Sequence, residues 1–134
     1  MRLKTGFISV LFLSLSGVTL AQPEPQRCED EVAQASAWIQ WAASHRAACL
    51  VTTHGTNERA RCLQDIRVQL SELEQQHTHV YATQIQALHA NHPVVKGLIS
   101  KLKDNVRAAE IAISTDAEPQ DIAEFRKQSC MERR

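Results

Sequence analysis

The sequence predicts an all-α protein: a small antiparallel bundle of three long helices and a short C-terminal helix, held by two disulfides. Three observations support this fold class. Residues that favour helices (Ala, Gln, Leu, Glu and Arg) dominate the composition. Glycine and proline, which interrupt helices, are scarce, with 4 residues each. Apolar side chains recur at spacings of three and four residues, as they do on one face of a helix.

The first 21 residues have the pattern of a secretory signal peptide. Arg2 and Lys4 supply positive charge, an apolar core of about ten residues follows, and Thr19 and Ala21 are the small residues that a signal peptidase reads. The apolar core is shorter than the roughly 20 residues that a membrane span requires. We therefore expect cleavage after residue 21 and one domain over residues 22–134. That domain would be periplasmic or secreted and carry no membrane anchor.

The first predicted helix covers about residues 29–52. Residues 22–27 before it contain two prolines, so we expect a loose N-terminal arm there. After the helix, Gly55 suits a left-handed helix end, and Thr56 or Asn57 suits the N-cap of the next helix. A turn is therefore predicted between the first and second helices.

The second predicted helix covers about residues 58–90. Its apolar stripe resembles the seam of a coiled coil and includes His77, which we expect to be buried or half-buried. Pro93 ends this helix, because the residue before proline avoids helical backbone, and it suits the first turn of a third helix. A turn over residues 114–119 then leads into a short fourth helix that carries the last cysteine.

Four cysteines follow the leader, and an even number in an exported chain indicates disulfides. Consecutive helices joined by a short turn pack antiparallel, which places Cys49 beside Cys62. Cys28 and Cys130 then pair by remainder. The chain has no C-x-x-C motif, so neither a dithiol redox pair nor a zinc knuckle is indicated.

Charge and motifs exclude several function classes. The chain has 15 basic and 15 acidic residues, so removal of Arg2 and Lys4 leaves 13 against 15, a net charge of −2. A nucleic-acid-binding protein would be basic, so we expect no nucleic-acid partner. No nucleophile elbow or glycine-rich phosphate loop occurs. We accordingly expect no enzymatic activity and no cofactor.

Trp38 and Trp41 lie on one side of the first predicted helix, displaced from its apolar stripe, with Arg46 near them. Tryptophan in a small bundle is usually packed in the core. Exposed tryptophan and arginine, in contrast, are enriched at interface hot spots. Together with the leader and a disulfide-held scaffold that lacks a catalytic motif, these three residues predict an interaction protein that binds a partner protein in the bacterial envelope. It would act as an inhibitor or immunity protein, or as an accessory subunit.

Metal or cofactor binding through His77, His79, His89 and His92 is the first alternative. His89 and His92 are three residues apart and are weak candidates for a shared metal site, although Pro93 places His92 at a helix end. Glu74 and His77 match one E-x-x-H pair, whereas a di-iron bundle needs two. His79 should be solvated. A holding chaperone is the second alternative.

Overall fold

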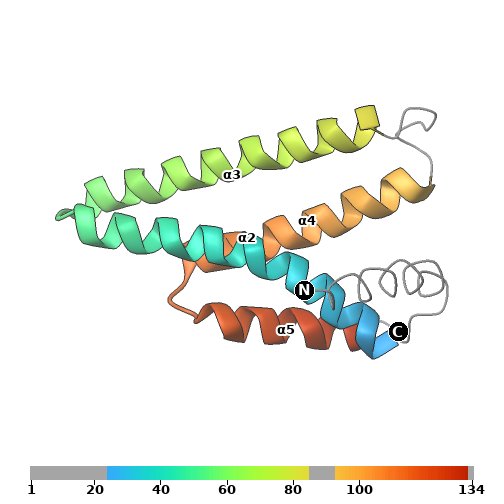
Figure 1. Ribbon diagram of the computed structural model, residues 1–134. Helices are drawn as coiled ribbons and strands as arrows, with labels where there is room; N and C mark the ends of the chain where they lie inside the picture. The colour runs from blue at the N-terminus through green and yellow to red at the C-terminus, as the bar shows by residue number, and fades with distance from the viewer. Residues whose placement is uncertain (1–23, 85–92, 133–134) are drawn as a thin grey trace, which may run out of the picture.

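The computed structural model describes residues 24–84 and 93–132. These residues form four helices and no strand: α2 (Glu24–Thr52), α3 (Thr56–Gln84), α4 (Pro93–Ser114) and α5 (Pro119–Glu132) (Figure 1). The predicted all-α bundle of three long helices and one short helix is confirmed. The predicted leader, and both His89 and His92, lie outside the described residues.

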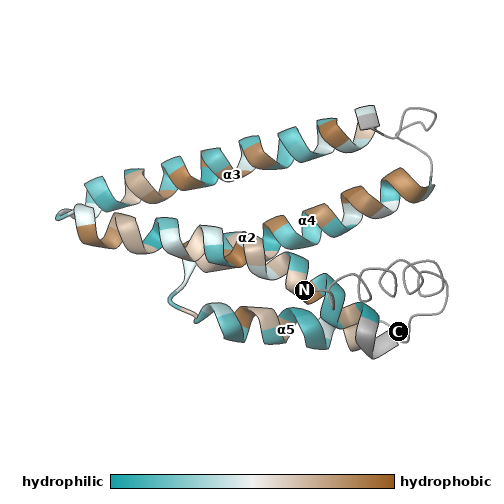
Figure 2. Ribbon diagram, viewed as in Figure 1, coloured by the Kyte–Doolittle hydropathy of each residue, from teal (hydrophilic) through white to brown (hydrophobic). Residues whose placement is uncertain are grey.

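Helices α2 and α4 each contact all the other described helices. Helix α2 packs most extensively on α4 and α5, whereas α3 packs more on α4 than on α2. Figure 1 shows α2 and α3 close together where they are joined and farther apart toward their other ends. Apolar and polar residues alternate along every helix, as Figure 2 shows, so each helix has one face for the core and one for solvent.

The core is built from single large aliphatic residues and many alanines. Ile39, Leu70, Ile113 and Ile122 come from the four different helices and are at most 5% exposed. The alanines of the core belong to α2 and α4: Ala35, Ala42, Ala108, Ala109 and Ala112. Small side chains let helix backbones approach closely, which explains why α2 and α4 form the most extensive helix pair.

The start of α2 differs from the prediction. The helix begins at Glu24, so the expectation of a loose arm is wrong for residues 24–27. Proline is tolerated in the first turn of a helix, because the backbone N–H that it lacks has no partner there. Pro25 therefore does not delay the helix. Residues 22 and 23 lie outside the described part of the chain.

The link between α2 and α3 also differs in detail. No glycine in the described residues has a positive φ, so the predicted left-handed conformation of Gly55 is wrong. The Gly55 carbonyl instead accepts the first helical hydrogen bond of α3, from the backbone N–H of Arg59, at 2.9 Å. Gly55 is thus the residue that caps the start of α3 rather than the one that terminates α2.

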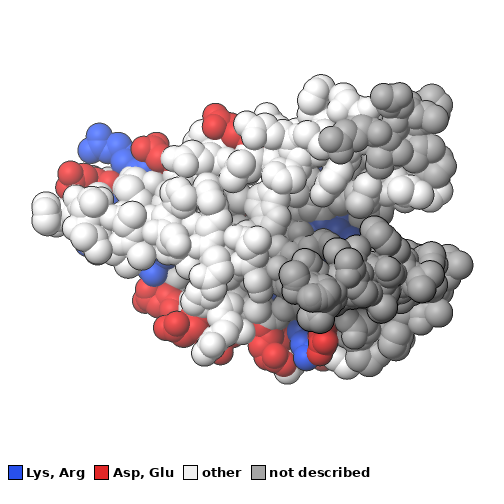
Figure 3. Space-filling view, in the orientation of Figure 1, with Lys and Arg blue, Asp and Glu red and all other residues white. Residues whose placement is uncertain are grey.

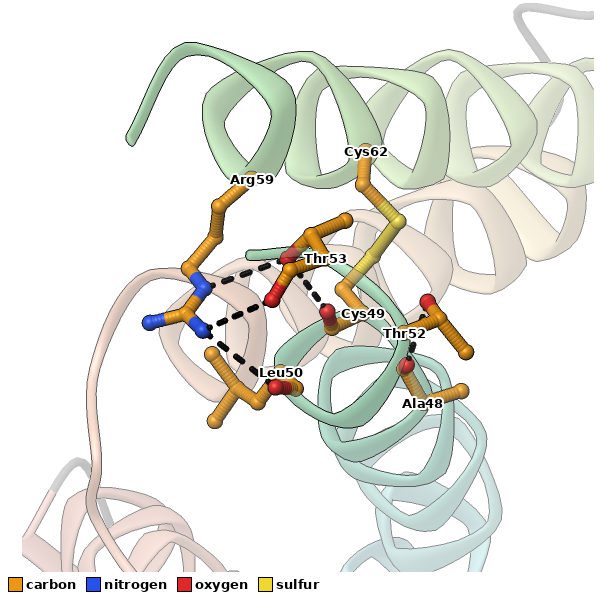
Figure 4. The surroundings of a disulfide bond; sticks show 7 residues. All are labelled: Ala48, Cys49, Leu50, Thr52, Thr53, Arg59 and Cys62. Atoms are coloured by element: carbon orange, nitrogen blue, oxygen red, sulfur yellow. Dashed lines mark hydrogen bonds between the residues drawn. A yellow bond between two sulfur atoms is a disulfide. The ribbon is translucent and has the colours of Figure 1, made fainter. Parts of the chain in front are cut away.

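The Arg59 side chain fastens this link (Figure 4). Its guanidinium donates to the carbonyl oxygens of Leu50 at 3.3 Å and Thr53 at 3.2 Å, and its Nε donates to Thr53 Oγ1 at 3.2 Å. These carbonyls lie at the end of α2, where helix carbonyls lack intrahelical partners and carry partial negative charge. A side chain of α3 therefore supplies hydrogen bonds to carbonyl oxygens at the end of α2.

Both predicted disulfides are confirmed. Cys49 at the end of α2 bonds to Cys62 of α3, with a sequence separation of 13. Cys28 near the start of α2 bonds to Cys130 near the end of α5, with a sequence separation of 102. No described helix combines the length and hydropathy that a bilayer span would need.

A charged cluster joins α2, α4 and α5. The guanidinium of Arg126 lies 3.6 Å from the Glu31 carboxylate and 3.5 Å from that of Asp104. Arg126 and Glu31 are both buried. Lys101 approaches Glu31 at 3.7 Å, and the exposed Arg107 approaches Asp104 at 3.2 Å. The cluster thus neutralises the buried charges where three helices meet.

Removing either disulfide should destabilise the fold, and the longer loop should matter more. On the chain-entropy model, replacing Cys49 and Cys62 by serine should cost about 3 kcal/mol, and replacing Cys28 and Cys130 about 4.7 kcal/mol. Urea unfolding of the two double variants, compared with the oxidised parent, measures both costs. A larger loss for the Cys49/Cys62 variant would contradict this ranking.

The two arginines that share Asp104 should differ in their effect on stability. Arg126→Met leaves a buried carboxylate incompletely paired and should lower the free energy of unfolding by about 3 kcal/mol. Arg107 has a side chain that is 70% exposed. Arg107→Met should therefore cost less than about 1 kcal/mol. Equal losses in thermal or urea unfolding would show that the burial of Arg126 is unimportant.

Candidate functional site

A groove between α2 and α3 has both tryptophans in its wall. It has a volume of about 220 Å³. Its lining residues are Ala37, Trp38 and Trp41 of α2 with Leu73 and His77 of α3. On α2, the tryptophans of the groove lie about two to three turns before Cys49, which the disulfide joins to α3.

Each tryptophan belongs partly to the core and partly to the surface. Trp38 and Trp41 both pack against the core cluster, and both are half-buried. They are three residues apart, so both side chains project from the same side of α2. The two tryptophans are therefore both core residues and part of the surface, so each of the two interpretations made from the sequence is partly correct.

An imidazole packs against each indole. The ring centroids of Trp38 and His77 are 5.0 Å apart, across the groove, and those of Trp41 and His45 are 4.4 Å apart on α2 itself. His77 is exposed, so the prediction of a buried or half-buried residue is wrong. The physical reason is the divergence of α3 from α2 toward the end of α3, which Figure 1 shows.

Hydrogen bonding fixes the neutral tautomer of both imidazoles. His77 Nδ1 lies 2.9 Å from the Leu73 carbonyl oxygen, and His45 Nδ1 lies 2.8 Å from that of Trp41. A carbonyl oxygen only accepts, so Nδ1 must carry the hydrogen in each case. The Nε2 atom of the neutral His77 ring is consequently a hydrogen-bond acceptor at the groove.

A second hollow continues the first along α3. It has a volume of about 210 Å³ and shares Trp41 and Leu73 with the first. We call the two together the tryptophan groove. Its lining residues are Ala37, Trp38, Trp41, Gln69, Glu72, Leu73, Gln76 and His77. It thus offers two indoles, an imidazole, two carboxamides and one carboxylate.

Arg46 does not belong to the tryptophan groove. Its guanidinium lies 2.7 Å from the carboxylate of Asp116, in the turn between α4 and α5. At 3.6 residues per turn, Arg46 lies about 140° around the helix from Trp41. The structure therefore brings together two of the three residues that were predicted to bind a partner and separates the third.

The α3 wall of the groove was not predicted. Gln69, Glu72, Leu73, Gln76 and His77 recur at spacings of three and four, which marks a single helix face. That spacing was visible in the sequence. What the sequence lacked was the pairing of this face with the tryptophan side of α2, which depends on the angle between the two helices.

The histidines give no support to a metal centre within the described residues. No three His, Cys, Asp or Glu side chains there are grouped as metal ligands would be. His79 is exposed, as predicted. It lies two residues from His77, so the two imidazoles project from different sides of α3.

Two other hollows lie away from the tryptophan groove. One, of about 350 Å³, lies between α2 and α5. Glu29 and Lys127 both line it and form an ion pair whose charged atoms are 3.5 Å apart. The other, of about 160 Å³, lies between α4 and α5 and is lined by Ile111 and Phe125. Phe125 is 64% exposed and marks a surface that the sequence pattern did not single out.

Filling the groove should protect the indoles from solvent without disturbing the fold. Ala37 is exposed and lines the groove. Ala37→Met keeps a good helix former, so stability should change by less than about 0.5 kcal/mol. Acrylamide should quench the tryptophan fluorescence of this variant less than that of the parent. Ala47→Met, at an exposed position of α2 outside the groove, is the matched control, and equal quenching in both variants would contradict the described geometry.

Comparison with protein-family models, with curated proteins and with solved structures found no match to this chain.

Proposed function

We propose that this protein is an exported, non-enzymatic interaction protein that binds a partner protein in the bacterial envelope through the tryptophan groove. The observation that carries the proposal is the position of Trp38 and Trp41, which are half-buried side by side in the wall of an open groove. An anchored indole with a free face is the typical form of an interface hot spot.

The groove is suited to binding because packing and a disulfide constrain its walls. Both tryptophans pack against the core, which restricts the conformations open to them before a partner arrives. The Cys49–Cys62 disulfide ties α2 to α3, the two helices that form the walls. A surface ordered in advance loses less conformational entropy on binding, which leaves more of the contact energy as affinity.

The predicted leader and the two disulfides support an exported protein, because disulfides persist in oxidising compartments such as the periplasm. An inhibitor or immunity protein, or an accessory subunit of an envelope machine, needs a stable surface of this kind and no catalytic group. The alternatives of metal or cofactor binding and of a holding chaperone gain no specific support from the described residues.

Capture of the partner should depend on the groove. The oxidised protein, immobilised as bait, should retain a specific partner from an envelope extract. Trp41→Ala should weaken retention by about 30-fold or more, as loss of a hot-spot residue does. Ala37→Met should weaken it as well, by occupying the groove while leaving the tryptophans in place.

Two controls separate groove binding from misfolding or general stickiness. Ala47→Met is the matched control for Ala37→Met, and Phe125→Ala removes an exposed aromatic residue outside the groove. Both variants should capture the partner as the parent does. Equal capture by the parent, Trp41→Ala and Ala37→Met, all folded by circular dichroism, would refute the proposal.

A further inference from the structure

We infer that the tryptophan groove receives a positively charged side chain of the partner, arginine above all, so that the partner binds through a basic segment. This inference rests on the proposed function and specifies the chemistry of the same site.

The aromatic walls suit a cation. The indole face carries negative electrostatic potential and attracts an ammonium or guanidinium group within about 6 Å of the ring centre. Two indoles line this groove, three residues apart on α2. Leu73 opposite them offers apolar contact to the aliphatic stem of a long side chain. The aliphatic stem of the side chain would thus contact Leu73, and its charged group would contact the indoles.

The polar lining is rich in acceptors. Glu72 contributes a carboxylate, and Gln69 and Gln76 contribute carboxamide oxygens. His77 contributes Nε2, because its Nδ1 hydrogen is committed to the Leu73 carbonyl. A guanidinium carries five N–H donors and no acceptor, so it matches this set better than an acidic or neutral side chain does.

The charges of the groove lining also favour a positively charged ligand. No lysine or arginine is among the described residues that line the groove. The basic residues nearest to the lining residues along α2 and α3 are Arg46, which pairs with Asp116 at 2.7 Å, and Arg67, which donates to Ser114 Oγ at 3.1 Å. Glu72 is exposed and forms no ion pair with another described residue. Figure 3 shows that the surface where α2 and α3 meet is mostly uncharged, with both acidic and basic groups on the α3 side.

Small probes test the chemistry directly. The chain contains 2 tryptophans, so its two indole N–H signals in a ¹H–¹⁵N NMR spectrum report on the groove alone. N-acetylarginine amide should shift both signals and bind about two- to fivefold more tightly than N-acetylcitrulline amide, which has the same shape without the charge. N-acetylglutamate amide should bind more weakly than either.

Matched variants then assign the charge. Glu72→Gln should reduce the affinity for the arginine probe toward that for the citrulline probe, and the indoles should keep the remainder of the preference. Glu110→Gln, at an exposed position of α4 outside the groove, should leave it unchanged. Equal affinities for the arginine and citrulline probes in the parent protein, or tighter binding of the glutamate probe, would overturn the inference.

Partner capture separates this inference from the proposed function. Glu72→Lys should abolish capture, whereas Glu110→Lys should not. If Ala37→Met abolishes capture and Glu72→Lys does not, the partner binds in the groove without a cation, and only the inference fails. If neither variant affects capture, the proposed function itself fails.

Discussion

Helix α2 is bonded covalently to a different helix near each end, and the rest of the structure depends on this constraint. Cys28 joins it to α5 and Cys49 joins it to α3. Between these two bonds its apolar face packs on α4, where alanines allow the backbones to approach closely. Because both bonds act on one helix, α2 cannot slide or turn relative to α3 without breaking the contacts that it makes with α4 and α5.

The tryptophan groove follows from this arrangement. The Cys49–Cys62 bond holds α2 and α3 together at one end, while α3 packs mainly on α4 and so diverges from α2 toward the other. Small side chains at positions 38 and 41 would leave the core open to solvent through the gap between α2 and α3. Trp38 and Trp41, which pack against the core and are half-buried, occupy this gap. The same two residues therefore stabilise the bundle and provide its most distinctive surface.

The helices and the cysteine pairing could be predicted because they depend on local signals: apolar spacing, Pro93 as a boundary, and the antiparallel packing that a short turn imposes. The angle between α2 and α3 could not, because it results from the competition of both helices for α4. His77 was misjudged for that reason: seven residues after the buried Leu70, it occupies the same helix face at a point where α2 has already moved away. The pairing of Glu31 with Arg126 was equally hidden, since charged residues at these positions carry no periodic signal.

The interhelix contact between Trp38 and His77 is the most direct test of this account, because it forms only if α2 and α3 lie in the described register. Their ring centroids are 5.0 Å apart, within the range of the nuclear Overhauser effect. In the oxidised protein we expect cross-peaks between the indole protons of Trp38 and the imidazole protons of His77. Their absence, with Trp38 giving cross-peaks to α5 instead, would contradict the placement of the tryptophans and of the groove.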